Sequence, residues 1–214
     1  MRILTLSVLL SCILLSNGPL TNASGSGTPL FNGKDLDGWA VLNGGQFSVA
    51  NGVLRVNRGT GWLRSNETFG DFLLTMEFRF LEAEAASGIF IRTAPTSKND
   101  ENGWPDHGYQ VQCMDTLTGN VPLAHLMPYG APPFEDLSVS DLSDLTDMEA
   151  LKRAYKPTGE WHTYEIKAEG ENLWIHLNGV LVTTASNIKQ LTGHIGIQAE
   201  GGLLEFRKIE VDRM

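Results

Sequence analysis

Apolar and polar side chains alternate from Leu74 to Phe80 within the segment 72–80, and this run constrains the fold more than any other part of the chain. Leu74 and Met76 fall on one side of the segment, whereas Glu77 and Arg79 fall on the other. A period of two is that of a β-strand with one buried face, and it does not fit a helix, whose period is 3.6. We therefore expect the fold to be built from strands.

Similar short runs, rich in β-branched or aromatic residues, recur to the end of the chain between Gly, Asn or Asp turns. Asn51-Gly52 and Asn178-Gly179 tolerate the positive φ that a tight hairpin turn requires. The pattern predicts an all-β sandwich of two antiparallel sheets. The candidate strands are 47–49, 53–56, 62–64, 72–80, 88–92, 109–114, 162–169, 173–177, 180–184, 194–199 and 203–211. The core between the sheets is expected to contain Ile89, Ile91, Val111, Ile166 and Ile175.

One segment departs from the period of two. Apolar residues recur every third position from Leu142 to Leu151, and Lys152 stands near the end, as a capped helix prefers. The sequence predicts one short helix between Ser140 and Tyr155, inside a long loop over residues 119–159. The prolines at the start of this loop exclude it from a sheet interior, and so long an insertion usually forms a lid or a rim.

Length and charge restrict the function classes. The chain has 214 residues, which suits one domain with a sizeable core, and 42% of them are hydrophobic, which excludes a disordered protein. The formal net charge is −9. A nucleic acid or an anionic membrane surface is therefore disfavoured as a partner, because such partners need basic surfaces.

The first residues resemble a secretory signal. Arg2 precedes an apolar run over residues 3–15, and Ala23 provides a small residue for cleavage, so we expect residues 1–23 to be removed and the protein to be exported to the periplasm or the extracellular space. The run is too short for a comfortable membrane span. Lipoprotein anchoring at Cys12 is the alternative, because residues 9–12 loosely resemble a lipobox. Residues 24–29 are expected to be a linker, and residues 30–212 a single domain in which Cys113 is buried and inert.

Polar side chains on three successive strands are expected to share one sheet face. Glu77 and Arg79 come from the first strand, Arg92 from the second, and Gln110 and Gln112 from the third. One interpretation is a simply solvated face. The other is a sugar-binding surface, because the carboxylate, the guanidinium groups and the amides can all bind hydroxyl groups.

Ordered sequence blocks in this chain resemble a known family. The opening block runs from Leu30 to Trp39 (LFNGKDLDGW), and each later block is weak alone but specific in this order. The later blocks are FLLTMEFR at 72–79, SGIFIR at 87–92, GYQVQ at 108–112, TGEWH at 158–162, LNG at 177–179, GIQAEGG at 196–202 and EFRKI at 205–209. Together they resemble the 3-keto-disaccharide hydrolase family, also described as 3-keto-glucoside lyases and hydratases.

The resemblance implies a fold and a chemistry. The fold would be a concanavalin A-like jelly-roll sandwich with one short helix in a long loop. The substrate would be a 3-keto-glucoside or 3-keto-disaccharide, whose ketone acidifies the C2 proton so that a base can remove it and C1 can lose its substituent, with hydration to follow. A sugar 3-dehydrogenase acting upstream would then be the pathway partner.

This chain also departs from the family pattern at several positions. The family usually has Glu at the position of Gln110, and Asn is common at the position of His162, whereas Asp115 follows the family pattern. Residues 121–155 replace a shorter segment, so the substrate preference does not carry over.

Elimination needs a base, a group that stabilises the enolate and an acid. We expect Glu77 to be the base or a metal ligand, with a structural salt bridge as the competing interpretation, and Arg92 to stabilise the enolate. Gln112 and Gln198 would bind hydroxyl groups, and Glu200 would be an acid or a second ligand. Arg79, Gln110 and Asp115 complete the expected substrate-binding set.

The loop from Trp104 to His107 adds a ring and a titratable imidazole beside the strand of Gln110. His107 is the candidate proton carrier and Trp104 a stacking platform, with His125 a weaker candidate for the proton. No cofactor is evident. Asp106, His107, Asp115 and Glu200 are candidate ligands for a divalent cation, although their spacing matches no zinc or calcium motif.

Two other function classes use the same fold. A retaining glucanase needs two flanking carboxylates on one strand, and the only Glu-x-Asp here, Glu210-Val211-Asp212, lies at the chain end. A non-catalytic, lectin-like carbohydrate-binding module is the stronger alternative, because sandwiches host lectins as readily as enzymes.

Overall fold

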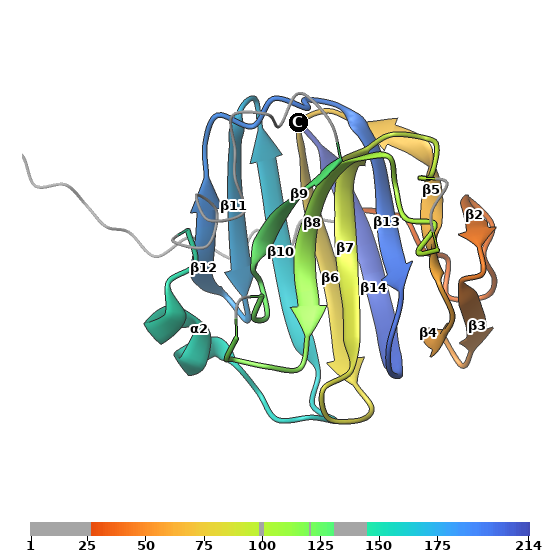
Figure 1. The fold of residues 1–214 in the computed structure, drawn as a ribbon, viewed down its shortest axis with the longest axis horizontal. Coiled ribbons are helices and arrows are strands. Elements are labelled where there is room, and N and C mark those ends of the chain that lie inside the picture. The colour runs from red at the N-terminus through yellow and green to blue at the C-terminus, as the bar shows by residue number, and fades with distance from the viewer. Residues whose placement is uncertain (1–26, 99–100, 120, 131–144) are drawn as a thin grey trace, which may run out of the picture.

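The computed structural model describes residues 27–98, 101–119, 121–130 and 145–214, and it is a sandwich of two antiparallel sheets (Figure 1). We call the eight-stranded layer sheet A; its strands run in the order β12-β11-β10-β6-β14-β4-β3, and β1 also pairs with β14. We call the six-stranded layer sheet B; its order is β2-β5-β13-β7-β8-β9, and it is the nearer layer in Figure 1. The expected all-β jelly-roll sandwich is confirmed.

The strands of sheet A are β1 (Thr28–Pro29), β3 (Gln46–Ala50), β4 (Val53–Arg58), β6 (Phe72–Phe80), β10 (His162–Glu169), β11 (Asn172–Leu177), β12 (Val180–Ala185) and β14 (Leu204–Arg213). Those of sheet B are β2 (Trp39–Asn43), β5 (Gly61–Phe69), β7 (Ala86–Thr93), β8 (His107–Met114), β9 (Leu126–Gly130) and β13 (Gly193–Ala199). Thr28 and Pro29, from the expected linker, pair with Val211 and Glu210. The ordered fold therefore begins slightly before Leu30.

Two tight hairpins follow from their Asn-Gly turns. Asn51 and Gly52 have φ values of 53° and 79° between β3 and β4, and Asn178 and Gly179 have 51° and 79° between β11 and β12. Consecutive positive φ values match the twist of the flanking strands. Both turns agree with the sequence prediction.

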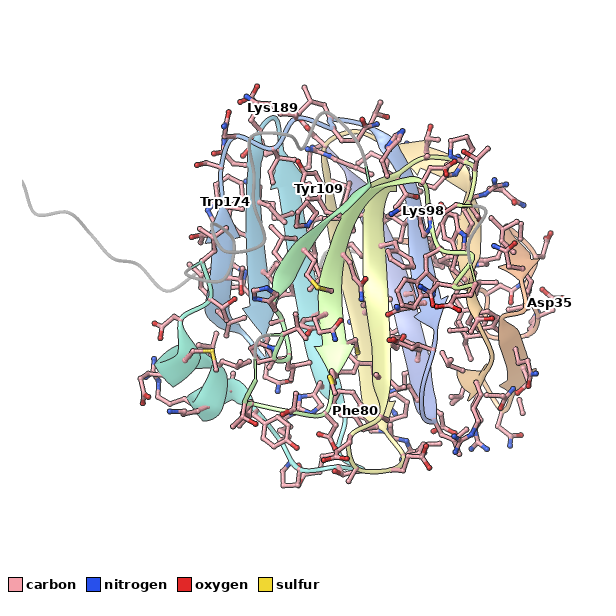
Figure 2. All side chains as sticks on the ribbon, viewed as in Figure 1. Asp35, Phe80, Lys98, Tyr109, Trp174 and Lys189 are labelled. Carbon is pink, nitrogen blue, oxygen red and sulfur yellow. The ribbon has the colours of Figure 1, made fainter. Side chains whose placement is uncertain are left out.

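The core lies between the sheets. β6 turns its apolar side inward as its alternation predicts, and Ile89, Ile91, Val111, Ile166 and Ile175 are all buried in the same cluster. Tyr109 and Phe80 also lie within the sandwich, whereas Asp35 stands exposed at its periphery (Figure 2). The predicted core is therefore confirmed.

The expected helix is α2 (Met148–Ala154). Asp147 caps it by accepting hydrogen bonds from the backbone N–H groups of Glu149 and Ala150, and Leu151 is buried. The earlier part of the predicted helical pattern, including Leu142, lies outside the described residues, as do residues 1–23 and Cys12. No helix in the described part of the chain is both long and apolar enough to cross a membrane.

Candidate functional site

Three glutamine side chains form a hydrogen-bonded cluster on the outer face of sheet B. Gln110 Nε2 donates to Gln112 Oε1 at 2.8 Å and to Gln198 Oε1 at 2.9 Å. Val111 and Cys113 alternate with the first two and lie in the core, so the amides point away from sheet A. All three side chains are buried. We call Gln110, Gln112 and Gln198 the amide cluster.

Two glycines make room for this face. A Cβ at Gly88 would collide with the side-chain amide of Gln110, and a Cβ at Gly196 would lie 2.5 Å from Trp62 Cε3. The Trp62 ring packs edge to face against Phe90, with centroids 5.7 Å apart. The face therefore combines buried amides with a buried aromatic pair.

His125 lies beside the amide cluster because of an irregularity in the backbone. Gln112 N donates to His125 O, while Ala124, at φ 63°, donates from its N to Gln112 O. Ala124 and Leu126 face the core, so alternation places the imidazole of His125 on the outer face next to Gln112. Burial lowers the pKa of His125, which favours the neutral imidazole.

Two buried polar atoms on this face lack a hydrogen-bond partner in the described part of the chain. They are Gln110 Oε1 and His125 Nε2. A buried polar atom without a partner costs free energy, and such atoms in native structures often await a ligand or water. This pair is the strongest structural indication that something polar binds here.

Glu200 follows Gln198 by two residues, at the end of β13. Its side chain reaches solvent, but the protein packed around the carboxyl desolvates it and raises its pKa. A carboxylic acid with a raised pKa holds its proton to higher pH. Glu200 can therefore donate a proton at this end of the face.

The expectation that Glu77 and Arg79 share this face is wrong. Both lie on β6 in sheet A and point outward on the opposite side of the sandwich. Glu77 forms an ion pair with Arg207 at 2.6 Å, and Arg79 pairs with Glu205 at 2.6 Å. The two sheets, about 10 Å apart, separate both residues from the amide cluster.

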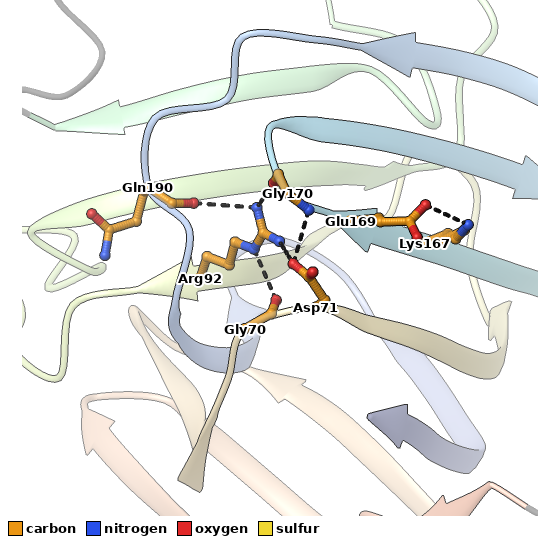
Figure 3. Close-up of polar contacts among 7 residues, drawn as sticks. All are labelled: Gly70, Asp71, Arg92, Lys167, Glu169, Gly170 and Gln190. Atoms are coloured by element: carbon orange, nitrogen blue, oxygen red, sulfur yellow. Dashed lines mark hydrogen bonds and ion pairs between the residues drawn. The ribbon is translucent and has the colours of Figure 1, made fainter. Parts of the chain in front are cut away.

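Arg92 also does not lie on the shared face. Phe90 pairs with Gly196 and Thr93 with His194, so two residues of β7 lie opposite one residue of β13, and Arg92 has φ 50° in this bulge. Its buried guanidinium donates to Gly70 O, Gly170 O and Asp71 Oδ1 at 2.8 to 3.0 Å, as Figure 3 shows. Arg92 therefore ties together the turns at one end of the sandwich and has its donors occupied there.

Asp115 acts as an anchor for the chain that leaves α2. It accepts hydrogen bonds from Tyr155 Oη at 2.6 Å and Thr158 Oγ1 at 2.5 Å. With both carboxylate oxygens engaged, Asp115 fixes this connection.

The loop from Trp104 to His107 adjoins the aromatic end of the face. Its Pro105 bridges to Ser97, whose hydroxyl accepts a hydrogen bond from Trp62 Nε1 at 2.9 Å, and Asp106 accepts one from Thr96. Trp104 is half-buried. His107 is half-buried at the start of β8, about 10 Å along the strand from Gln110.

The candidate cation ligands do not converge. Within residues 27–98, 101–119, 121–130 and 145–214, no group of three or more His, Cys, Asp or Glu side chains is placed to hold a metal ion. Asp106, His107, Asp115 and Glu200 are thus not brought together. Cys113 is buried as expected, and burial raises the pKa of its thiol well above the usual value.

Residues 26–212 match the model of the 3-keto-alpha-glucoside-1,2-lyase-like domain family. The chain belongs to this family. Membership supports a carbohydrate-related function, in agreement with the resemblance of the ordered blocks. A search of curated proteins finds no match.

Several solved structures have the same fold. A candidate glycosyl hydrolase from Parabacteroides distasonis is 21% identical, with a TM-score of 0.61 and coverage of 87% of this chain and 98% of that chain. Carbohydrate binding module CBM66 from Bacillus subtilis is 14% identical, with a TM-score of 0.54 and coverage of 82% and 95%. A β-glucanase from Bacillus licheniformis is 14% identical, with a TM-score of 0.51 and coverage of 87% and 96%. At these identities the likeness concerns the fold alone.

Proposed function

We propose that the outer face of sheet B binds a 3-keto-glucoside and cleaves it by elimination. The unsatisfied Gln110 Oε1 and His125 Nε2, buried on one face of a member of this family, carry the proposal. A ketone at C3 makes the C2 proton acidic, so a neutral base beside the bound sugar is sufficient to remove it. His125 is the neutral base on this face.

In this mechanism His125 Nε2 takes the proton from C2, and the electrons of the C2–H bond form an enolate with its charge on the C3 oxygen. The amide N–H groups of Gln112 and Gln198 are the donors for that oxygen. The Oε1 atoms of both side chains accept hydrogen bonds from Gln110 Nε2. Among the described residues, Gln112 Nε2 contacts one protein atom, Met114 Sδ, at a long distance of 3.8 Å. Preorganised donors at a developing oxyanion are a strong catalytic device.

Collapse of the enolate restores the C3 ketone, forms the C1=C2 double bond and breaks the bond from C1 to the leaving oxygen. Glu200 gives its proton to that oxygen. The products are an unsaturated 3-keto sugar and the free alcohol or second sugar, and water can add to the double bond afterwards. Gln110, where the family usually has Glu, serves in this chain to orient the other two amides.

The proposal has two implications for the cell. The substrate must come from oxidation of a glucoside at C3, so a sugar 3-dehydrogenase is the expected upstream partner. We also propose that residues 1–23 direct export to the periplasm or beyond, with Cys12 anchoring as the alternative.

The test is to incubate the purified protein with 3-keto-trehalose and aryl 3-keto-glucosides, with and without chelator, beside the unoxidised parents. Release of sugar or aglycone from the keto substrates alone is expected, with a primary isotope effect when C2 carries deuterium. Equal turnover of the parents would refute elimination. Binding of keto sugars without turnover would favour a lectin-like function, which the amide at position 110 would suit.

A further inference from the structure

A second polar pocket lies on the outer face of sheet A, on the far side of the sandwich from the amide cluster. Its volume is about 310 Å³, and its lining includes Ser48, Asn51, Arg55, Arg79 and Glu205. Pockets for small molecules start at roughly 300 Å³, so the space suits a ligand the size of one sugar. Nothing in the proposed elimination uses these residues.

Strand register builds this pocket. Ser48 pairs with Arg55, Arg55 with Glu205, and Glu205 with Arg79, so one row of side chains crosses β3, β4, β14 and β6 on the same face. At the end of the row the guanidinium of Arg79 lies 4.7 Å from the ring centroid of Trp161. The row is therefore held in place by the sheet rather than by a loop.

A single carboxylate fixes both arginines. Glu205 Oε1 accepts from Arg55 Nε and Nη2 at 3.1 and 2.5 Å, and Glu205 Oε2 accepts from Arg79 Nε at 2.8 Å and lies 2.6 Å from Arg79 Nη2 in the same ion pair. The Glu205 side chain is 7% exposed, whereas those of Arg55 and Arg79 are 46% and 34% exposed. Burial alone would raise the pKa of Glu205, but the hydrogen bonds from both arginines outweigh it and lower the pKa, so Glu205 is ionised.

The charges in the pocket do not cancel. Two guanidinium groups share one carboxylate, which leaves one positive charge in a chain whose formal net charge is −9. Each guanidinium has five N–H donors, and Arg55 uses two of them and Arg79 one in hydrogen bonds to Glu205, so donors remain for a ligand. Ser48 Oγ and the amide of Asn51 add groups that can bind hydroxyls.

We propose that this pocket is a second, non-catalytic binding site for a carboxylate carried on a sugar, that is, a hexuronate at the end of a glycan. An arginine fork matches a carboxylate in charge and geometry, and the pocket volume with Ser48 and Asn51 accommodates the hydroxylated ring. The site lies across the sandwich from the amide cluster, so glucuronate binding can be tested independently of the proposed elimination.

The experiment is NMR titration or calorimetry of the whole protein at low salt with four probes: glucuronate, acetate, methyl glucoside and sulfate. Glucuronate should bind most tightly and weaken as salt rises. Equal binding of acetate or sulfate would show a plain anion site, equal binding of methyl glucoside would show a neutral sugar site, and no binding would show no site; each result overturns the proposal.

Two variants and a matched control test whether glucuronate binds in this pocket. Arg55→Gln should weaken glucuronate binding at least about tenfold, because it removes one of the two guanidinium groups that attract the carboxylate. Arg58→Gln is the matched control: it lies on the same strand but pairs with Glu82 outside the pocket, and it should bind as wild type does. Ser48→Phe fills the pocket from an exposed position and leaves Arg55, Arg79 and Glu205 in the chain, so it should also abolish binding. Wild-type affinity in both Arg55→Gln and Ser48→Phe would contradict the proposal.

Discussion

Gln110 on β8 and Gln198 on β13 are hydrogen-bonded to each other, although β7 lies between these two strands. Their amides meet at 2.9 Å above β7, because Gly88 on that strand has no side chain to block the contact. The bond joins β8 to β13 through side chains alone. It also leaves Gln110 Oε1 without a partner among the described residues. One glycine thus determines whether the amide cluster can form.

Gly88→Ala should disrupt this arrangement. The new methyl group would occupy the position of the Gln110 amide, and such overpacking typically costs about 1–3 kcal/mol of stability. Urea unfolding measures the loss. Adding Gln110→Ala to Gly88→Ala should recover most of it, since the clash is then removed. Gly201→Ala, at a position with open space, is the control and should change stability by less than about 0.5 kcal/mol. Equal losses in the two glycine variants would argue against the packing described.

Arg92→Met should destabilise the fold rather than abolish catalysis. It removes the donor for Gly70 O, Gly170 O and Asp71, which should cost about 3 kcal/mol. Turnover per folded molecule should stay near the wild-type value. Arg213→Met, which breaks an exposed pair with Glu67, is the control and should cost less than about 1 kcal/mol. A loss of turnover of about 100-fold at undiminished stability would instead identify Arg92 as an oxyanion-binding group.

His162 should make stability depend on pH. It is stacked on Phe78, and burial lowers its pKa to about 4. Between pH 6.5 and 4 the unfolded chain binds a proton that the folded chain does not, so stability is complete above pH 6.5 and is lost as the pH falls toward 4. The contribution reaches about 3 kcal/mol. Urea unfolding from pH 7.5 to 4.5 should show a smaller pH slope for His162→Asn than for the wild type. Identical slopes would be evidence against this assignment.

The sequence predicted the period of two, the hairpins and the core residues because these depend on local conformation and on alternation. Val111 and Cys113 faced inward as predicted, so Gln110 and Gln112 faced outward together. Alternation within a strand does not say which sheet the strand joins. β6 and β7 are consecutive in the chain but belong to different sheets, which separated Glu77 from Gln110.

Because of two bulges, alternation in the sequence did not predict the positions of Arg92 and His125. The extra residue in β7 turned Arg92 away from the face that its parity predicted, and the irregular pairing at Ala124 placed His125 beside Gln112. Neither bulge contains a glycine or a proline that would mark it in the sequence: Arg92 and Ala124 adopt positive φ values without one. The proline-rich surroundings of His125 made it only a secondary candidate.

Glu200 should control the alkaline side of the activity profile. A proton donor must be protonated to act, and desolvation raises the pKa of this carboxyl, so kcat/KM for 3-keto-glucosides should fall as the pH rises through that pKa. Glu200→Gln should lower the rate and flatten this part of the profile. Substrates with a good leaving group need no proton and should be least affected. An unchanged profile in Glu200→Gln would exclude this role.

The proposed elimination takes place on the outer face of sheet B, and one pair of variants distinguishes this face from the opposite side of the sandwich. We would measure kcat/KM for an aryl 3-keto-glucoside in His125→Gln, on that face, and in Glu77→Gln, on the outer face of sheet A. We expect a loss of about 100-fold or more for His125→Gln, because it removes the general base, and wild-type activity for Glu77→Gln. Wild-type activity in His125→Gln together with a large loss in Glu77→Gln would contradict it and place the reaction on the opposite side of the sandwich.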